Sequence, residues 1–133
     1  MTNGVLLPKK KQREYNGGEW TEGRFNSFVT SILRSGSRRW GPKYQTLNAA
    51  KTEKKTNVKS GRLAQHFLCA ECNEEYVAKD VQVDHIVPIG VEKTWDEFID
   101  GLFCEGDNLQ VLCVPCHKIK TTKEKKKKWL LTM

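Results

Sequence analysis

The chain has no long apolar run and no leader-like N-terminus. No apolar stretch approaches the roughly 18 residues that a membrane-spanning helix requires, so the sequence predicts no membrane partner. The first 30 residues lack the apolar core of a signal peptide, because Val5-Leu6-Leu7 is followed at once by Pro8 and a lysine run. These absences predict a protein of the reducing cytoplasm, where paired cysteines read as metal ligands rather than disulfides.

Acidic residues are scarce at both ends of the chain, and basic residues are scarce in its middle. Residues 1–68 carry 14 Lys and Arg against 4 Asp and Glu, and residues 118–133 carry 7 Lys against a single Glu. Residues 69–117 carry 2 Lys against 11 Asp and Glu. Basic arms favour a polyanionic partner and an acidic middle favours divalent cations, although an isolated lysine run is more often merely solvated.

The N-terminal half predicts two helices behind a basic tail. We expect a flexible tail over residues 1–19 and a basic helical extension over residues 20–62. Thr21 is placed to cap a first helix that stops at Gly36. A second helix follows Pro42, with Tyr44, Leu47 and Ala50 turned inward, and then gives way to a polar, basic connection over residues 51–59.

The C-terminal half predicts strand, short helix, strand and helix, in a domain spanning residues 63–133. Residues 81–87 have the apolar alternation of a strand, with Val81, Val83 and either Ile86 or Val87 supplying apolar contacts. Thr94–Glu97 is a capping-box pattern that opens a helix through about residue 103. A second strand over residues 109–113 and a helix from Pro115 complete an α+β fold.

Two Cys-x-x-Cys pairs, 40 residues apart, predict a tetrahedral zinc site. Because all four ligands would be thiolates, no position is left for a substrate and the zinc would be structural. Cys104 belongs to neither pair and is expected to be a small buried residue. His66 is a less favoured alternative ligand. The four cysteines are Cys69, Cys72, Cys113 and Cys116.

Four polar residues form a candidate catalytic set. Asp84 and His117 offer an oxygen and a nitrogen ligand for one divalent ion and leave most of its coordination shell open. His85 is a candidate general base, because imidazole titrates near neutral pH. Asn108 could hold that imidazole through its amide or its backbone carbonyl. Taken singly, each has an ordinary alternative, such as a turn position for Asn108 or a zinc-ligand role for His117.

The motifs in residues 83–88, 107–113 and 116–121 together resemble an HNH nuclease of the ββα-metal fold, similar to small HNH proteins of bacteriophages. The resemblance covers roughly residues 66–122. It implies His85 as general base, Asp84 and His117 as ligands of Mg²⁺ or Mn²⁺, Asn108 as the residue that orients the site, and a structural zinc on the four cysteines. Residues 94–105 are longer than the usual connection.

The predicted function is a metal-dependent endonuclease acting on DNA, expected to be double-stranded, in the cytoplasm of a phage-infected host. Its architecture would be a zinc-braced ββα-metal core with an N-terminal two-helix extension. Two alternatives stay open: a non-catalytic zinc-knuckle module that binds nucleic acid, and an interaction protein of a phage packaging machine. Nicking and double-strand cutting both fit the motif, as do roles in homing, packaging and attack on host DNA. The expected phosphate contacts are Arg34, Arg38, Arg39, Lys43, Lys118, Lys120 and Lys123.

Overall fold

The computed structural model describes residues 14–90 and 92–132. The chain divides into two compact units, with the division between Gly36 and Ser37. The boundary expected at residue 62 therefore differs from the observed one, because the second half of the predicted helical extension belongs to the second unit. Most of the predicted tail, residues 1–13, lies outside the described residues.

The first unit is a turn followed by helix α1 (Glu22–Ser37). Thr21 caps the helix as predicted, with its Oγ1 accepting a hydrogen bond from the Arg24 backbone N–H at 3.1 Å. Aromatic contacts tie the turn to the helix: Tyr15 stacks on Phe25 with ring centroids 4.4 Å apart. The helix continues through Gly36, so the predicted stop at that glycine falls one residue early.

The second unit begins with helix α2 (Gly41–Ala49), which has proline in its first turn as predicted. Tyr44 is 53% exposed, so the inward orientation predicted for it is wrong. The predicted connection after α2 is also wrong, because residues 51–56 form strand β1 (Lys51–Thr56). This polar strand has no apolar alternation of its own, and it forms by pairing with its neighbour.

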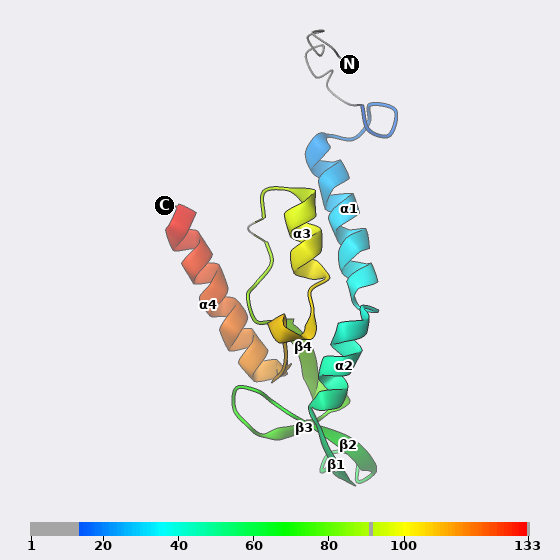
Figure 1. Ribbon diagram of the computed structural model, residues 1–133, viewed down its shortest axis with the longest axis vertical. Helices are drawn as coiled ribbons and strands as arrows, with labels where there is room; N and C mark the ends of the chain where they lie inside the picture. Colours follow the sequence, from blue (N-terminus) through cyan, green and yellow to red (C-terminus); the bar gives the residue numbers. More distant parts are fainter. Residues whose placement is uncertain (1–13, 91, 133) are drawn as a thin grey trace. The chain divides into compact units, whose positions relative to one another are not determined.

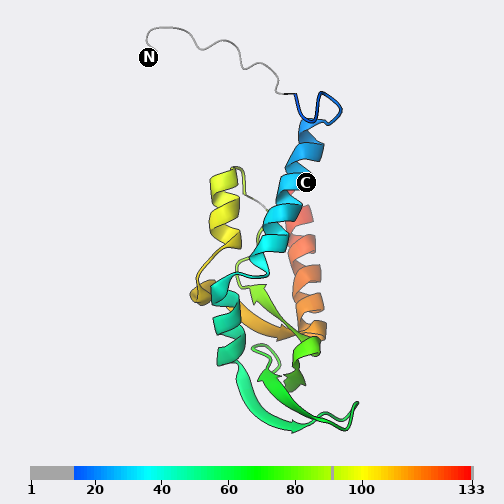
Figure 2. The same cartoon turned by 90° about the vertical axis from the view of Figure 1, so that its right-hand side faces the viewer.

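A three-stranded antiparallel sheet contains β1, β2 (Leu63–Leu68) and β3 (Glu75–Val77) in that order. Figure 2 shows β1 and β2 joined by a tight turn, below the rest of the second unit. Phe67 and Val77 are buried in the core. The short 3-10 turn η1 (Ala78–Asp80) leads from this sheet to the next strand.

The remaining chain forms the predicted ββα unit (Figure 1). Strands β4 (Val81–His85) and β5 (Leu109–Cys113) pair antiparallel, with His85 opposite Leu109, and helix α4 (Val114–Thr132) follows β5 directly. Four residues of β5 are at most 5% exposed, which makes that strand the centre of the core: Leu109, Val111, Leu112 and Cys113. The predicted α+β class is confirmed.

The segment between β4 and β5 carries helix α3 (Trp95–Leu102) and the 3-10 turn η2 (Gly106–Asn108). The cap forms as predicted, with Thr94 Oγ1 accepting from the Glu97 N–H at 3.2 Å. The Glu97 carboxylate reaches back to the N–H of Lys93, one residue before the cap, at 3.0 Å. Ile86 and Val87, predicted to continue the strand, are 44% and 66% exposed. Strand β4 therefore ends at His85, where the polar site begins.

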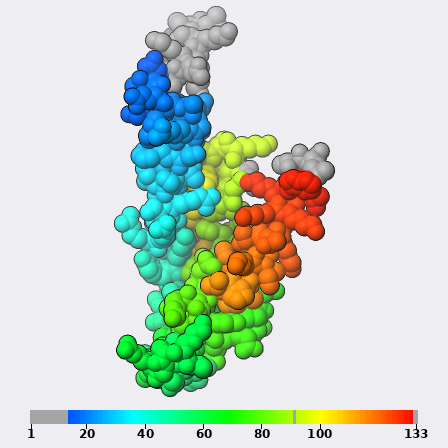
Figure 3. All heavy atoms as spheres, turned by 180° about the vertical axis from the view of Figure 1, so that it is seen from behind, coloured from blue at the N-terminus to red at the C-terminus, as the bar shows by residue number. Residues whose placement is uncertain are grey.

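The space-filling view in Figure 3 shows α4, in orange and red, next to the green strands of the second unit. Among the described residues, no helix is both long enough and apolar enough to cross a membrane.

Candidate metal centres and active site

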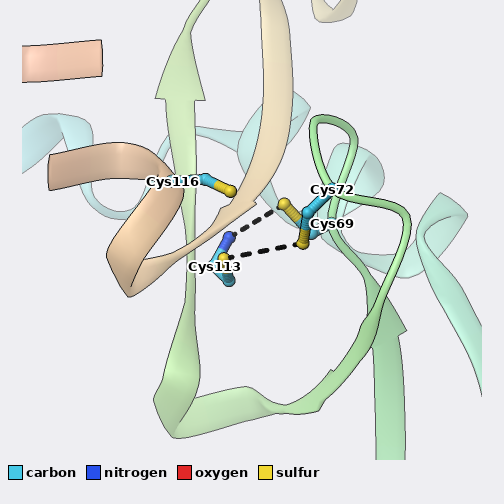
Figure 4. A group of neighbouring side chains, drawn as sticks. All are labelled: Cys69, Cys72, Cys113 and Cys116. Atoms are coloured by element: carbon cyan, nitrogen blue, oxygen red, sulfur yellow. Dashed lines mark hydrogen bonds between the residues drawn. The ribbon is translucent and has the colours of Figure 1, made fainter. Parts of the chain in front are cut away.

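The four paired cysteines converge on one point (Figure 4). Cys69 follows β2, Cys113 ends β5, and Cys116 lies in the first turn of α4. All four Sγ atoms lie within 4.8 Å of one another, and those of Cys72 and Cys113 are 3.9 Å apart. Four sulfurs bound tetrahedrally to one zinc ion lie about 3.8 Å apart, so the cluster has the donor set and spacing that zinc requires.

Hydrogen bonds in the cluster favour a thiolate at Cys69. Burial opposes ionisation, but backbone N–H groups, among them that of Cys113 at 3.3 Å, outweigh it and lower the pKa of Cys69 to about 6. The opposite holds at Cys116, where the hydrogen bond with Cys113, together with burial, raises the pKa to about 12. A dication is the natural compensation for four thiolates held this close together.

His66, considered as an alternative ligand, is not in this cluster. Its Nδ1 donates to the carbonyl oxygen of Ala64 at 2.9 Å, and the residue is buried in the core. Cys104 also lies outside the cluster. It is partly buried, and burial raises the pKa of its thiol, which agrees with the expected structural role.

A second cluster forms where β4 meets the first turn of α4. His117 Nε2 lies 3.4 Å from Asp84 Oδ1, and the Asp84 side chain is only 11% exposed. Two ligand atoms bound about 2.1 Å from one ion at right angles lie about 3.0 Å apart, so this pair fits a shared divalent ion. Gln110, opposite Asp84 in the sheet, donates to the other carboxylate oxygen at 3.3 Å.

Lys120, one turn further along α4, completes the surroundings of Asp84. Its Nζ lies 3.0 Å from Asp84 Oδ2 and donates to the carbonyl oxygen of His85 at 3.0 Å, and it also pairs with Glu124. Burial favours the neutral amine, yet hydrogen bonds with Glu124 and Asp84 raise the pKa of Lys120. Lys120, expected on the phosphate-binding surface, is instead engaged inside the site.

His85 ends strand β4 beside Asp84, and its ring is held from the inserted segment. Its Nε2 lies 3.1 Å from the carbonyl oxygen of Leu102, the last residue of α3. A carbonyl can only accept, so Nε2 carries the proton and, in the neutral ring, Nδ1 carries the lone pair. This tautomer leaves a nitrogen of His85 able to accept a proton from water.

Asn108 contacts the backbone that follows His85. Its Oδ1 accepts from the Val87 N–H at 2.9 Å, its Nδ2 lies 3.5 Å from the Val87 carbonyl, and its own carbonyl accepts from the Ile86 N–H at 2.9 Å. The imidazole of His85 is bonded to the Leu102 carbonyl, and Asn108 holds the backbone of Ile86 and Val87 directly after it. Asn108 therefore fixes the main chain at the end of β4.

The other predicted phosphate contacts fall into two groups. Arg34, Arg38, Arg39, Lys118 and Lys123 are exposed, whereas Lys43 is partly buried and donates to Ser37 Oγ at 3.4 Å.

Trp40 packs against the segment that follows α3. Its ring meets Phe103 edge-on with centroids 5.5 Å apart, and its Nε1–H donates to the Cys104 carbonyl.

Three site contacts were not anticipated from the sequence: the Leu102 carbonyl, the Gln110 amide and the inward ammonium of Lys120. For Gln110 a signal exists, because pairing His85 with Leu109 puts Gln110 directly opposite Asp84. No comparable local signal marks Leu102, which reaches the site through the packing of α3.

Comparison with known proteins gives one relevant similarity. No family model matches the chain, and no solved structure matches it. A curated protein named "Probable HNH endonuclease", from Lactococcus phage SK1, is 41% identical over 68 residues, which cover 50% of this chain and 67% of the phage protein. This similarity supports a nuclease function, with nucleic acid as the substrate. On that identity and coverage, the chain belongs to the HNH endonuclease family.

Proposed function

We propose that this protein is a DNA endonuclease that hydrolyses phosphodiester bonds with His85 as general base and one divalent ion held by Asp84 and His117. The observation that carries the proposal is the 3.4 Å approach of His117 Nε2 to Asp84 Oδ1, next to the end of β4 that carries His85. A non-catalytic zinc knuckle would need the cysteines and the basic surface, but it would have no use for this second cluster.

The residues of the site divide the chemistry among them. Bound at Asp84 and His117, Mg²⁺ or Mn²⁺ would neutralise charge developing on the phosphate and on the leaving oxygen. The lone pair on Nδ1 of His85 takes the proton of the attacking water. The Leu102 carbonyl holds Nε2–H throughout, and this contact keeps the ring oriented and favours the imidazolium that forms.

Two further residues keep this arrangement in place. Gln110 and Lys120 both hold Oδ2 of Asp84, which leaves Oδ1 directed at His117. Lys120 also ties the His85 carbonyl to α4, so that the strand end and the helix that carries His117 cannot separate easily. The resulting rigidity suits a reaction that depends on positioning within fractions of an ångström.

Duplex DNA is the proposed substrate. Exposed cations just before α2, at Arg38 and Arg39, and on α4, at Lys118 and Lys123, offer sequence-independent phosphate contacts. The first turn of α4 presents N–H groups beside the proposed metal ligands. The relative from a Lactococcus phage supports a phage origin and a role during infection.

The test uses supercoiled plasmid, zinc-loaded protein and added Mg²⁺. The proposal predicts relaxed or linear plasmid, loss of cleavage when Mg²⁺ is withheld, and recovery with Mg²⁺ or Mn²⁺. Asp84→Ala and His117→Ala should abolish cleavage, whereas Gln82→Ala, exposed on the same strand, should cleave normally. Normal cleavage by both ligand variants would contradict the metal assignment, and binding without cleavage by the unaltered protein would favour the knuckle alternative.

A further inference from the structure

The hairpin formed by β1 and β2, whose turn spans residues 57–62, is strongly basic. Residues 51–62 contain five Lys and Arg and one Glu. The site described above uses none of them. So many cations on a two-stranded ribbon favour binding of a polyanion there.

Most of this charge is not neutralised within the protein. Lys55 pairs with Glu75 of β3 across the sheet. The other four cations, Lys51, Lys54, Lys59 and Arg62, are exposed, and none of them forms an ion pair within residues 14–90 and 92–132. The hairpin therefore presents a concentrated positive potential to the solvent.

Two apolar side chains lie among these cations. Val58, in the turn, is 96% exposed, and Leu63, at the start of β2, is 69% exposed. A simpler explanation for the lysines on β1 is that they keep this edge strand from pairing with other chains. That role gives no reason for an apolar side chain at the tip, where it would promote association instead.

The turn has a defined conformation. The Gly61 N–H donates to the Asn57 carbonyl at 2.7 Å, and the Asn57 N–H donates to the Arg62 carbonyl at 2.8 Å. Gly61 has a φ of +71°, which a residue with a side chain rarely adopts. These bonds hold Val58 and its flanking cations at the tip, and Figure 3 shows this part of the chain, in green, standing out from the surface.

The base of the hairpin is joined to the catalytic core. The Leu68 N–H donates to the Ala50 carbonyl at 2.9 Å and closes the ribbon. Directly after β2, Cys69 enters the thiol cluster, and the Ala70 N–H donates to the Val111 carbonyl of β5 at 2.8 Å. Cys116 of the same cluster neighbours His117, so the cluster fixes the spacing between the hairpin and the proposed metal site.

We propose that the β1–β2 hairpin is a DNA-contacting element that enters the major groove of duplex DNA, an inference that rests on the proposed function. The major groove is about 12 Å wide and admits a two-stranded ribbon. Lys54, Lys59 and Arg62 contact the phosphates that flank the groove. Val58 reaches the base edges, where a thymine methyl group is the apolar partner.

The experiment compares two double variants by binding titration on a labelled DNA duplex, at several salt concentrations and without added divalent metal. Lys54→Gln/Arg62→Gln removes two exposed hairpin cations. Lys79→Gln/Lys93→Gln removes two exposed cations elsewhere in the second unit and is the matched control, because both variants lose the same net charge. We expect the hairpin variant to bind about ten- to a hundredfold more weakly at 0.1 M salt, with a salt slope shallower by about 1.8, and the control to change little.

Val58→Asn forms the second arm. At 96% exposure the substitution leaves folding intact, and it should weaken duplex binding severalfold without changing the salt slope. Equal effects of the two double variants, or no effect of either, would overturn the inference. Equally strong hairpin-dependent binding to duplex RNA would overturn it too, because the deep, narrow major groove of RNA excludes a ribbon.

Cleavage of plasmid by the same proteins with Mg²⁺ separates this inference from the proposed function. If the unaltered protein cleaves and the hairpin variants bind DNA normally, the proposed nuclease function is supported and the DNA-contacting role of the hairpin is contradicted. If the protein binds DNA through the hairpin but never cleaves it, the hairpin's role is supported and the nuclease function is contradicted.

Discussion

The ammonium of Lys120 lies 3.0 Å from Oδ2 of Asp84, the oxygen turned away from His117. The same ammonium donates to the His85 carbonyl, so one side chain of α4 contacts both residues at the end of β4. We therefore propose Lys120 as a positioning residue for the proposed metal ligand and base.

Lys120→Gln should slow single-turnover cleavage at saturating protein by about tenfold, which corresponds to about 1.4 kcal/mol of transition-state stabilisation. The physical reason is the loss of a charge-assisted hydrogen bond that holds the Asp84 carboxylate. Lys125→Gln, exposed on the same helix, is the control and should keep the cleavage rate. Equal rates for all three proteins would show that Lys120 does not position Asp84.

The thiol cluster predicts one tightly held zinc ion per chain, measurable by elemental analysis. Cys113→Ser should lose the zinc and the folded structure, because metal binding of about 10 kcal/mol or more contributes directly to folding in a core this small. Cys104→Ser, outside the cluster, should keep both. A folded protein that contains no zinc would contradict a structural metal at this position.

Asn108→Ala should destabilise the protein by about 1 kcal/mol, since the exposed Val87 N–H loses its hydrogen-bond acceptor. It should also slow cleavage, because the main chain after His85 is no longer fixed. Asn108→Asp keeps the acceptor for the Val87 N–H. Its midpoint of urea unfolding should therefore lie between those of Asn108→Ala and the unaltered protein. The prediction fails if both variants unfold at the same urea concentration as the unaltered protein.

Trp40→Phe should lower the free energy of unfolding by about 1 kcal/mol through loss of the hydrogen bond to the Cys104 carbonyl. Trp40→Ala should cost about 3 kcal/mol, because the edge-on contact with Phe103 is lost as well. Duplex affinity should change little in either variant. Weaker DNA binding with unchanged stability would mean that Trp40 stacks on a base.

Residues with strong local chemistry allowed the core of the fold to be predicted. The apolar alternation through Val83 and the run from Leu109 to Cys113 indicate the two strands, and the paired Cys-x-x-Cys motifs indicate a cluster that the structure confirms. Asp84 and His117 were expected in one site from their ligand chemistry and from the family resemblance, and the structure brings them together at 3.4 Å.

What escaped prediction depends on tertiary partners. Strand β1 has the polar sequence KTEKKT, and it is a strand only because β2 offers a pairing edge. The inward direction of Lys120 depends on how α4 is rotated against β4. The Leu102 carbonyl reaches His85 across 17 residues of sequence, through a helix whose packing no local pattern specifies.

The measurement that bears most directly on the account is the single-turnover cleavage rate of His85→Ala on a DNA duplex with Mg²⁺, at saturating zinc-loaded protein. Because His85 takes a proton only as the water attacks, the substitution should remove an interaction made in the transition state. We predict a rate at least about a hundredfold below that of the unaltered protein, with duplex affinity and zinc content unchanged. A His85→Ala protein that cleaves at the unaltered rate would contradict the assignment of the general base.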